Sequence, residues 1–134
     1  MGSATDTEEN DVLKARFGGT SPAQPATWYV ALTTTTPTDA AAGTEVTGGA
    51  YARVALTNNT TNFPVPTVGV ISNGTAVTFP APTAAWGTVT HFELWDALTA
   101  GTRRYWGSLT TARTINNGDA APSFAVGAIQ IVAD

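Results

Sequence analysis

The few residues of this sequence that could support catalysis gather in one stretch. His91 is the only histidine, Glu93 follows two positions later, and Asp96 three positions after that. A Ser–His–Asp triad would also need a positioned serine, but Ser72 and Ser108 lie in turn-like and strand-like sequence rather than at a nucleophile elbow. We therefore predict no catalytic residue. A partly buried or interfacial histidine is expected instead, on the same strand face as Glu93, where the two could form a pH-sensitive pair.

Two other kinds of chemical site also find little support. Glu93 and Asp96 could form a carboxylate pair for glycoside hydrolysis, but no ordered aromatic subsites surround them in the sequence. The loop carboxylates of Asp39, Glu45 and Asp119 do not have the spacing of a calcium-binding loop. The chain has no cysteine, which excludes thiolate catalysis, disulfides and Cys–Zn sites. We expect neither a metal nor a cofactor.

The composition narrows the range of partners. The net charge is −4 with only six basic residues, so no nucleic-acid-binding face is expected. No stretch is apolar enough for a signal peptide or a membrane span, so we expect a soluble product without a membrane partner. Charged residues make up only 12% of the chain, and Thr and Ala about a third. A Thr-rich surface of low charge is typical of a protein that packs against many neighbours; the alternative is a small soluble β-domain with a compositional bias.

The tryptophan-rich stretch 86–106 predicts the hairpin that should nucleate the core. Residues 89–95 and 103–109 are rich in aromatic and β-branched side chains and read as strands joined by a turn at 96–102. Alternation places Trp95 with His91 and Glu93 on the more polar face of the first strand. A large ring on that face indicates that the face is covered, and a neighbouring subunit is one candidate for the cover. These three residues are therefore interface candidates.

The rest of the chain predicts further short strands separated by turn signals. Asn-Gly turns are expected at 72–75 and 116–119, each closing a hairpin. With the hairpin above, the pattern gives about eight strands, and it predicts an all-β, antiparallel β-sandwich (jelly-roll-like) domain over residues 21–134. The further strands are expected at 28–34, 51–56, 68–71 and 76–79, around Phe124 and Val126, and at 129–132.

The N-terminal segment differs from the rest and predicts a short helix near Asp6–Phe17. Thr5 and Glu8 match a capping box, and the pair at 18–19 supplies glycine at the C-terminal end. Its apolar stripe is narrow, so the helix would be marginal alone and must dock on something. We predict that residues 1–20 form an attachment arm; the alternative is a frayed acidic terminus. The interface candidates on the arm are Val12, Leu13 and Phe17.

Several segments, in this order, resemble a family of small structural proteins encoded by tailed bacteriophages. They are WYVALTTTTP, GTEVTGGAYARVAL, SNGTAVTFP, AAWGTVTHFELWDA and YWGSLTTARTINNGD. Members of this family are described as tail-fibre-like or as head-decoration (cement) proteins. The resemblance runs from Trp28 to Asp134, whereas the N-terminal helix and residues 58–66 fit less well. It implies a β-sandwich virion component without enzyme activity.

Three functions follow as hypotheses. The first is a capsid decoration protein that binds the outside of the head and stabilises it. Its partners would be the major capsid protein and neighbouring copies in a homodimer or homotrimer, on the capsid surface of the virion, after synthesis in the host cytoplasm. The second is a tail-fibre or baseplate component of the virion. The third is a carbohydrate-binding module that uses Trp28, Trp86 or Trp106 as stacking platforms.

Overall fold

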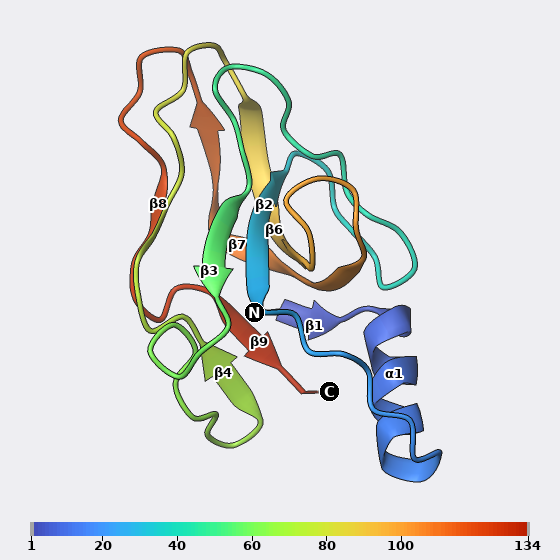
Figure 1. Ribbon diagram of the computed structural model, residues 1–134. Coiled ribbons are helices and arrows are strands. Elements are labelled where there is room, and N and C mark those ends of the chain that lie inside the picture. The colour runs from blue at the N-terminus through green and yellow to red at the C-terminus, as the bar shows by residue number, and fades with distance from the viewer. Residues whose placement is uncertain (1, 134) are drawn as a thin grey trace.

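The computed structural model describes residues 2–133, which form two β-sheets and one helix. The large sheet is strongly curled and the small one lies beside it (Figure 1). In spatial order the large sheet contains β3 (Val54–Thr57), β2 (Thr27–Thr33), β6 (Gly87–Trp95), β7 (Arg103–Ile115), β1 (Gly2–Ala4), β9 (Gln130–Val132) and β4 (Val70–Ser72). The small sheet pairs β5 (Val77–Thr78) with β8 (Ser123–Phe124). The expected all-β, sandwich-like fold class is confirmed.

The strands differ from expectation in number and distribution. All eight predicted strands overlap one of β2 to β9, whereas β1 was not predicted. A jelly roll divides eight strands between two sheets, but here seven strands share one sheet and two form the other. The pairing is also not wholly antiparallel, because β1 runs parallel to β9.

The predicted hairpin of β6 and β7 is confirmed as the centre of the large sheet. Its register runs from the Gly87–Ile115 pair to the Trp95–Arg103 pair, and β7 continues well beyond its predicted end at residue 109. Trp86 comes directly before β6, is 5% exposed, and donates from Nε1 to the carbonyl of Gly49 at 2.8 Å. Gly49 has φ +56°, and a Cβ there would lie 2.9 Å from that nitrogen, so the ring requires glycine beneath it.

β1 connects the two parts of the large sheet. It pairs antiparallel with β7 from Gly2–Gly107 to Ala4–Tyr105, and Gly2 pairs on its other side with Ile131 of β9. A Cβ on Gly2 would lie 2.8 Å from the side chain of Ile131, so only glycine fits between the two strands. The predicted division at residues 20/21 therefore needs a correction, because the segment assigned to the arm begins with a strand of the domain.

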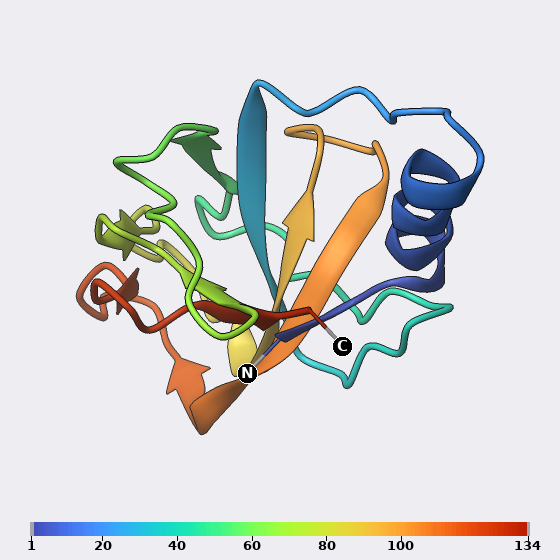
Figure 2. The same cartoon turned by 90° about the horizontal axis from the view of Figure 1, so that it is seen from below.

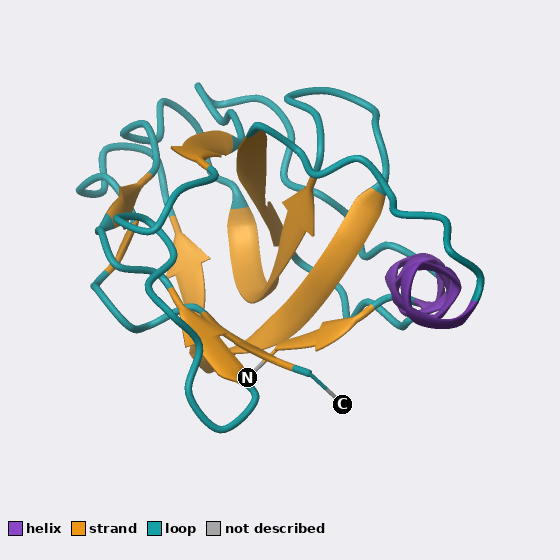
Figure 3. Cartoon of the chain, turned by 60° about the horizontal axis from the view of Figure 1, so that its bottom comes forward, coloured by secondary structure: helices purple, strands orange, loops and turns teal. Residues whose placement is uncertain are grey.

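The helix α1 (Asp6–Phe17) has the predicted limits. The hydroxyl oxygen of Thr5 accepts from the backbone N–H of Glu8 at 3.3 Å, and Gly18 lies at the C-terminal end. Acidic residues lie in the first turn and basic residues in the last, which suits the helix dipole. None of its residues is buried, so the helix stands at the side of the β-structure (Figure 3).

Both predicted Asn-Gly turns form, but neither closes a hairpin. β4 before the first turn pairs with β9, and β5 after it pairs with β8. Asn73 is 1% exposed, and its carboxamide adds side-chain hydrogen bonds to those of its main chain. Its Nδ2 donates to the carbonyls of Thr75 and Ala125, and its Oδ1 accepts from the N–H of Ile129, all at 2.8–3.0 Å. Asn73 therefore joins its own turn to a distant part of the chain.

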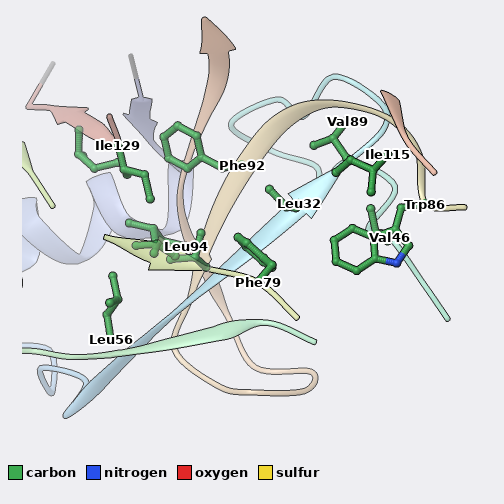
Figure 4. Close-up of a cluster of buried hydrophobic side chains, with 13 residues drawn as sticks. Leu32, Val46, Leu56, Phe79, Trp86, Val89, Phe92, Leu94, Ile115 and Ile129 are labelled. Carbon is green, nitrogen blue, oxygen red and sulfur yellow. The ribbon is translucent and has the colours of Figure 1, made fainter. Parts of the chain in front are cut away.

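The core lies inside the curl of the large sheet (Figure 4). Aromatic rings connect it to the small sheet. Phe124 of β8 packs edge-on against Phe92 of β6 and against Phe79, with ring centroids 6.1 and 6.3 Å apart. Tyr51 stacks on Phe79 and meets Trp86 edge-on. Such pairs add about 0.5–1.5 kcal/mol beyond the area they bury.

We predict that Asn73→Ala lowers the free energy of unfolding by about 3 kcal/mol, because it leaves buried main-chain groups without partners. Asn117→Ala is the matched control, since Asn117 is an exposed residue in the other Asn-Gly turn, and it should change stability by less than about 0.5 kcal/mol. Urea denaturation followed by tryptophan fluorescence measures both. Equal effects would show that the carboxamide of Asn73 does not hold the fold.

Removing residues 1–4 should destabilise the domain far more than breaking α1 does. The truncation deletes the strand between β7 and β9, whereas Val12→Pro disrupts a helix that buries no residue. Thermal unfolding by circular dichroism at a β-sheet wavelength compares the two variants. A truncated protein with a near-native transition would mean that β9 and β4 do not need β1.

Candidate functional site

The chain's own 34–50 loop covers Glu93 on the polar face of β6. Glu93 is 0% exposed, and its carboxylate accepts from the N–H of Gly43 at 2.8 Å and from Nε1 of Trp95 at 3.0 Å. Nη1 of Arg103 lies 3.6 Å from it. The prediction of Glu93 as an interface residue is therefore wrong, because its side chain is enclosed within the domain.

His91 does not form the expected pair with Glu93. Its Nδ1 lies 2.8 Å from the hydroxyl of Thr90, and its ring faces that of Trp106 at 6.1 Å. Burial lowers the pKa of His91 below its usual value. The side chain is half-buried, which agrees with the predicted partial burial of this residue. A role of His91 in an interface stays a prediction.

Trp95 is held by Arg53, whose guanidinium carbon lies 4.2 Å from the centre of the ring. This guanidinium also makes a two-point contact with Glu45 at 2.8 and 2.9 Å. Its Nη1 donates to the carbonyls of Ala97 and Ala100 in the turn after β6. Arg53 thereby joins the 34–50 loop to the β6–β7 turn across the face of Trp95, which explains why a large ring lies on the polar side of the strand.

Glu93 and Arg103 form a buried electrostatic pair. Burial raises the pKa of Glu93, opposed by the donors of Gly43 and Trp95 and by the charge of Arg103. Burial likewise lowers the pKa of Arg103. Its Nη2 donates to the carbonyls of Thr38 and Asp39, while its Nη1 has no hydrogen-bond partner. These contacts anchor the 34–50 loop. The pair is buried and out of reach of a substrate, so its role is structural.

The helix α1 docks on the sheet through its charged residues. Nη1 of Arg104 contacts Asp11 at 2.7 Å and Glu8 at 3.3 Å, and the hydroxyl of Tyr105 donates to Glu8 at 3.0 Å. Burial and the nearby charge of Glu8 raise the pKa of Tyr105, so the phenol stays a donor. This contact with the sheet uses the charged residues, so docking of the apolar stripe on the capsid surface or a neighbouring copy stays a prediction.

The apolar residues of α1 are consequently left at the surface. Val12 is 48% exposed, Leu13 55% and Phe17 86%. All three were predicted as interface residues, and their exposure leaves them available to a partner. Nothing in the described chain covers Phe17, the most exposed of the three, at the last position of the helix.

An open groove of about 640 Å³ runs between α1 and the loop at 58–69. Figure 2, seen from below, shows α1 on one side, the loop with β4 on the other, and β2, β6 and β7 between them. The groove is mainly apolar, with Glu8 and Glu9 on its helix wall. Its walls and floor include Val12, Leu13, Phe63, Pro66, Gly69, Trp28, Ile71, Leu94, Tyr105 and Ile131. No sequence pattern marked it, because its residues come from α1, from six different strands and from the 58–69 loop.

The three proposed sugar-stacking tryptophans do not form a common platform. Trp86 is buried in the core. Trp28 lies in the groove, edge-on to Tyr105 at 5.9 Å. Trp106 donates from Nε1 to the carboxylate of Asp39 at 2.8 Å. Of the three, Trp28 and Trp106 are half-exposed, and they lie in different places on the surface.

Residues 2–133 contain no group of three or more His, Cys, Asp or Glu side chains placed to hold a metal ion. No helix in this part of the chain is both long and apolar enough to cross a membrane.

Glu93→Gln should cost about 2 kcal/mol of stability at neutral pH, whereas Glu93→Ala should cost about 4 kcal/mol. Glutamine keeps one oxygen that accepts from Gly43 or Trp95 but turns its NH2 group towards the other donor, while alanine removes both acceptors and leaves a cavity. Chemical denaturation of both variants measures the difference. Equal losses would show that shape, and not hydrogen bonding, makes Glu93 necessary.

The same carboxyl should make stability depend on pH. Its folded-state pKa is raised above the ordinary 4.5, so folding favours the protonated form. The contribution of Glu93 to the free energy of unfolding is full below that ordinary value and is lost as the pH rises through the folded-state pKa. Wild type should therefore lose stability relative to Glu93→Gln over this window. Parallel pH profiles of the two proteins would contradict the assignment.

The comparisons with known proteins identify one family. The family model described as "Podophage GP4 fiber I protein gp80" matches residues 3–132. No curated protein matches the chain. The match includes α1 and the 58–69 loop, which carried little of the resemblance in the sequence. The chain therefore belongs to the podophage GP4 fiber I protein gp80 family, a family of tailed-phage virion structural proteins.

Proposed function

We propose that this protein is a structural component of the fibre apparatus of a podophage virion and acts by protein–protein contact instead of catalysis. The observation that carries the proposal is that a charged side chain is buried while several apolar side chains are exposed. Its buried carboxylate, Glu93, is used to hold a loop, whereas Val12, Leu13 and Phe17 are exposed beside an apolar groove. Exposed apolar surface gathered in one place is typical of a binding surface.

The fibre assignment is preferred to head decoration because the family description names a fibre protein. Head decoration, with the major capsid protein as partner, is supported by the Thr-rich and weakly charged composition. That composition suits any protein with many neighbours and does not favour the head over the tail. A sugar-binding module has less support, since one of its three stacking candidates, Trp86, is buried.

Counting and locating the protein in purified virions tests the proposal. Quantitative mass spectrometry should give a copy number far below that of the major capsid protein. Labelling with a specific antibody in electron microscopy should mark the fibres at the tail. Labelling over the whole head, with a copy number comparable to that of the capsid subunits, would instead establish head decoration. Absence from the virion would overturn both assignments.

Leu13→Asp should sharply reduce incorporation into virions, because it places a charge in the groove wall where a partner would exclude water. Val126→Asp is the matched control, since Val126 is also exposed, at 63%, but does not line the groove. Both variants should keep near-native stability, as both side chains already face solvent. The measurement is the amount of each variant in particles from a complemented deletion phage; equal incorporation would remove the groove from the attachment surface.

A further inference from the structure

A second cavity, which shares no lining residue with the groove, lies between the large sheet and the small sheet. It has a volume of about 250 Å³ and is open to solvent. Its floor is apolar, because it consists of buried side chains of the core, which Figure 4 labels: Leu32, Phe79, Val89, Phe92 and Ile115.

An irregularity of the central hairpin shapes the mouth of this cavity. Val89 pairs with Arg113 and His91 pairs with Ser108, so a single residue of β6 lies opposite the four residues 109–112 of β7. Bulges bend a strand and redirect its side chains, and they are over-represented next to active sites. Three of these four residues line the cavity, so the bulge contributes directly to its wall.

Arg113 is the one charged residue that lines the cavity. It pairs directly across the hairpin with Val89, whose side chain is buried. Residues directly opposite each other in an antiparallel pair point to the same face of the sheet. The side chain of Arg113 therefore projects from the core side of the sheet, at the exposed rim of the cavity.

Arg113 also lacks a counterion in the described part of the chain. Within residues 2–133 it forms no ion pair and no side-chain hydrogen bond, and no carboxylate lines the cavity. The other arginines on the strands and loops each pair with a carboxylate; these are Arg53, Arg103 and Arg104. The cavity thus presents a guanidinium, with its fork of N–H donors, to a ligand from outside.

Hydroxyl groups complete the rim. Ser108, Thr110, Thr111 and Ser123 are exposed and line the cavity together with Arg113. Sites for small molecules have this composition, with an apolar lining and a few polar groups that fix the orientation of the ligand.

We propose that this cavity binds a small organic carboxylate, with the negative group on Arg113 and a compact apolar face on the floor. The inference goes beyond the proposed function and does not depend on the fibre assignment. The volume equals that of about eight molecules of liquid water and lies below the range of about 300–1,000 Å³ for drug-sized ligands. The ligand is therefore no larger than a single ring with its substituents.

Two sources supply this chemistry, a hydrocarbon acid and an acidic sugar. Titrations followed by proton–nitrogen correlation NMR test both, with benzoate and glucuronate as the carboxylates and benzyl alcohol and glucose as their neutral counterparts. At least one carboxylate should shift the amide signals of residues 108–113 and 123–124, with a Kd of about 1–10 mM for a ligand of this size. Its neutral counterpart should bind about tenfold more weakly, because it offers no charge to Arg113.

Substitution of Arg113 tests the contact itself. Arg113→Gln should weaken binding of the carboxylate about tenfold and leave the neutral counterpart unchanged. Arg113→Lys should bind with intermediate affinity, since the ammonium keeps the charge but loses the two-point contact. Both variants should fold, because the side chain is exposed and unpaired within residues 2–133. Arg16→Gln is the matched control, since it removes the same charge from an exposed arginine outside the cavity, and it should bind like wild type.

Binding of benzoate alone would assign the site to hydrocarbon acids, and binding of glucuronate alone to acidic sugars; either result supports the inference. Three results would overturn it: no shift of these signals at about 50 mM of either carboxylate, equal affinity for a carboxylate and its neutral counterpart, or Arg113→Gln binding as well as Arg16→Gln. None of them bears on the copy number and location of the protein in virions, which test the fibre assignment separately.

Discussion

The large sheet depends on the three residues of β1, which join its two parts. Gly2–Ala4 form the strand between β7 and β9, and through it the last strands of the chain join those of the central hairpin. The position of Gly2 admits no side chain, because Ile131 and the backbone of Trp106 occupy the space. The curl that encloses the core and forms the floor of the groove therefore depends on a contact between opposite ends of the sequence.

The interior of the protein is stabilised partly by polar groups that would ordinarily suggest a site. Glu93 and Arg103 lose solvation on burial, and the hydrogen bonds that offset this cost fix the 34–50 loop over β6. Asn73 performs a similar task between two distant segments. Glu93, Arg103 and Asn73 each make at least one hydrogen bond to the main chain of a distant loop, so each helps to fix the conformation of that loop.

The helix shows how tertiary contacts decide which side of a short helix stays exposed. Its apolar stripe was expected to dock on a partner, since burial of apolar area is the usual stabilising term. Arg104 and Tyr105 instead offer donors at positions that match Glu8 and Asp11, and the helix turns its acidic side inward. As a consequence, Val12 and Leu13 form one wall of an open groove, which supports the proposed binding surface.

The sequence alone determined the local features: the limits of α1 through its cap and its glycine pair, the β6–β7 hairpin through aromatic and β-branched residues, and the approximate places of the other strands. It also carried the resemblance to tailed-phage structural proteins. Only the tertiary structure decided that β1 enters the sheet, that Glu93 is buried, and that a groove exists. The strand β1 has only three residues, which are too few to show a periodicity. The burial of the Glu93 carboxylate depends on Gly43 and Arg103, which lie in other parts of the sequence. Local patterns report what a segment prefers, whereas pairing and enclosure depend on which distant segments it meets.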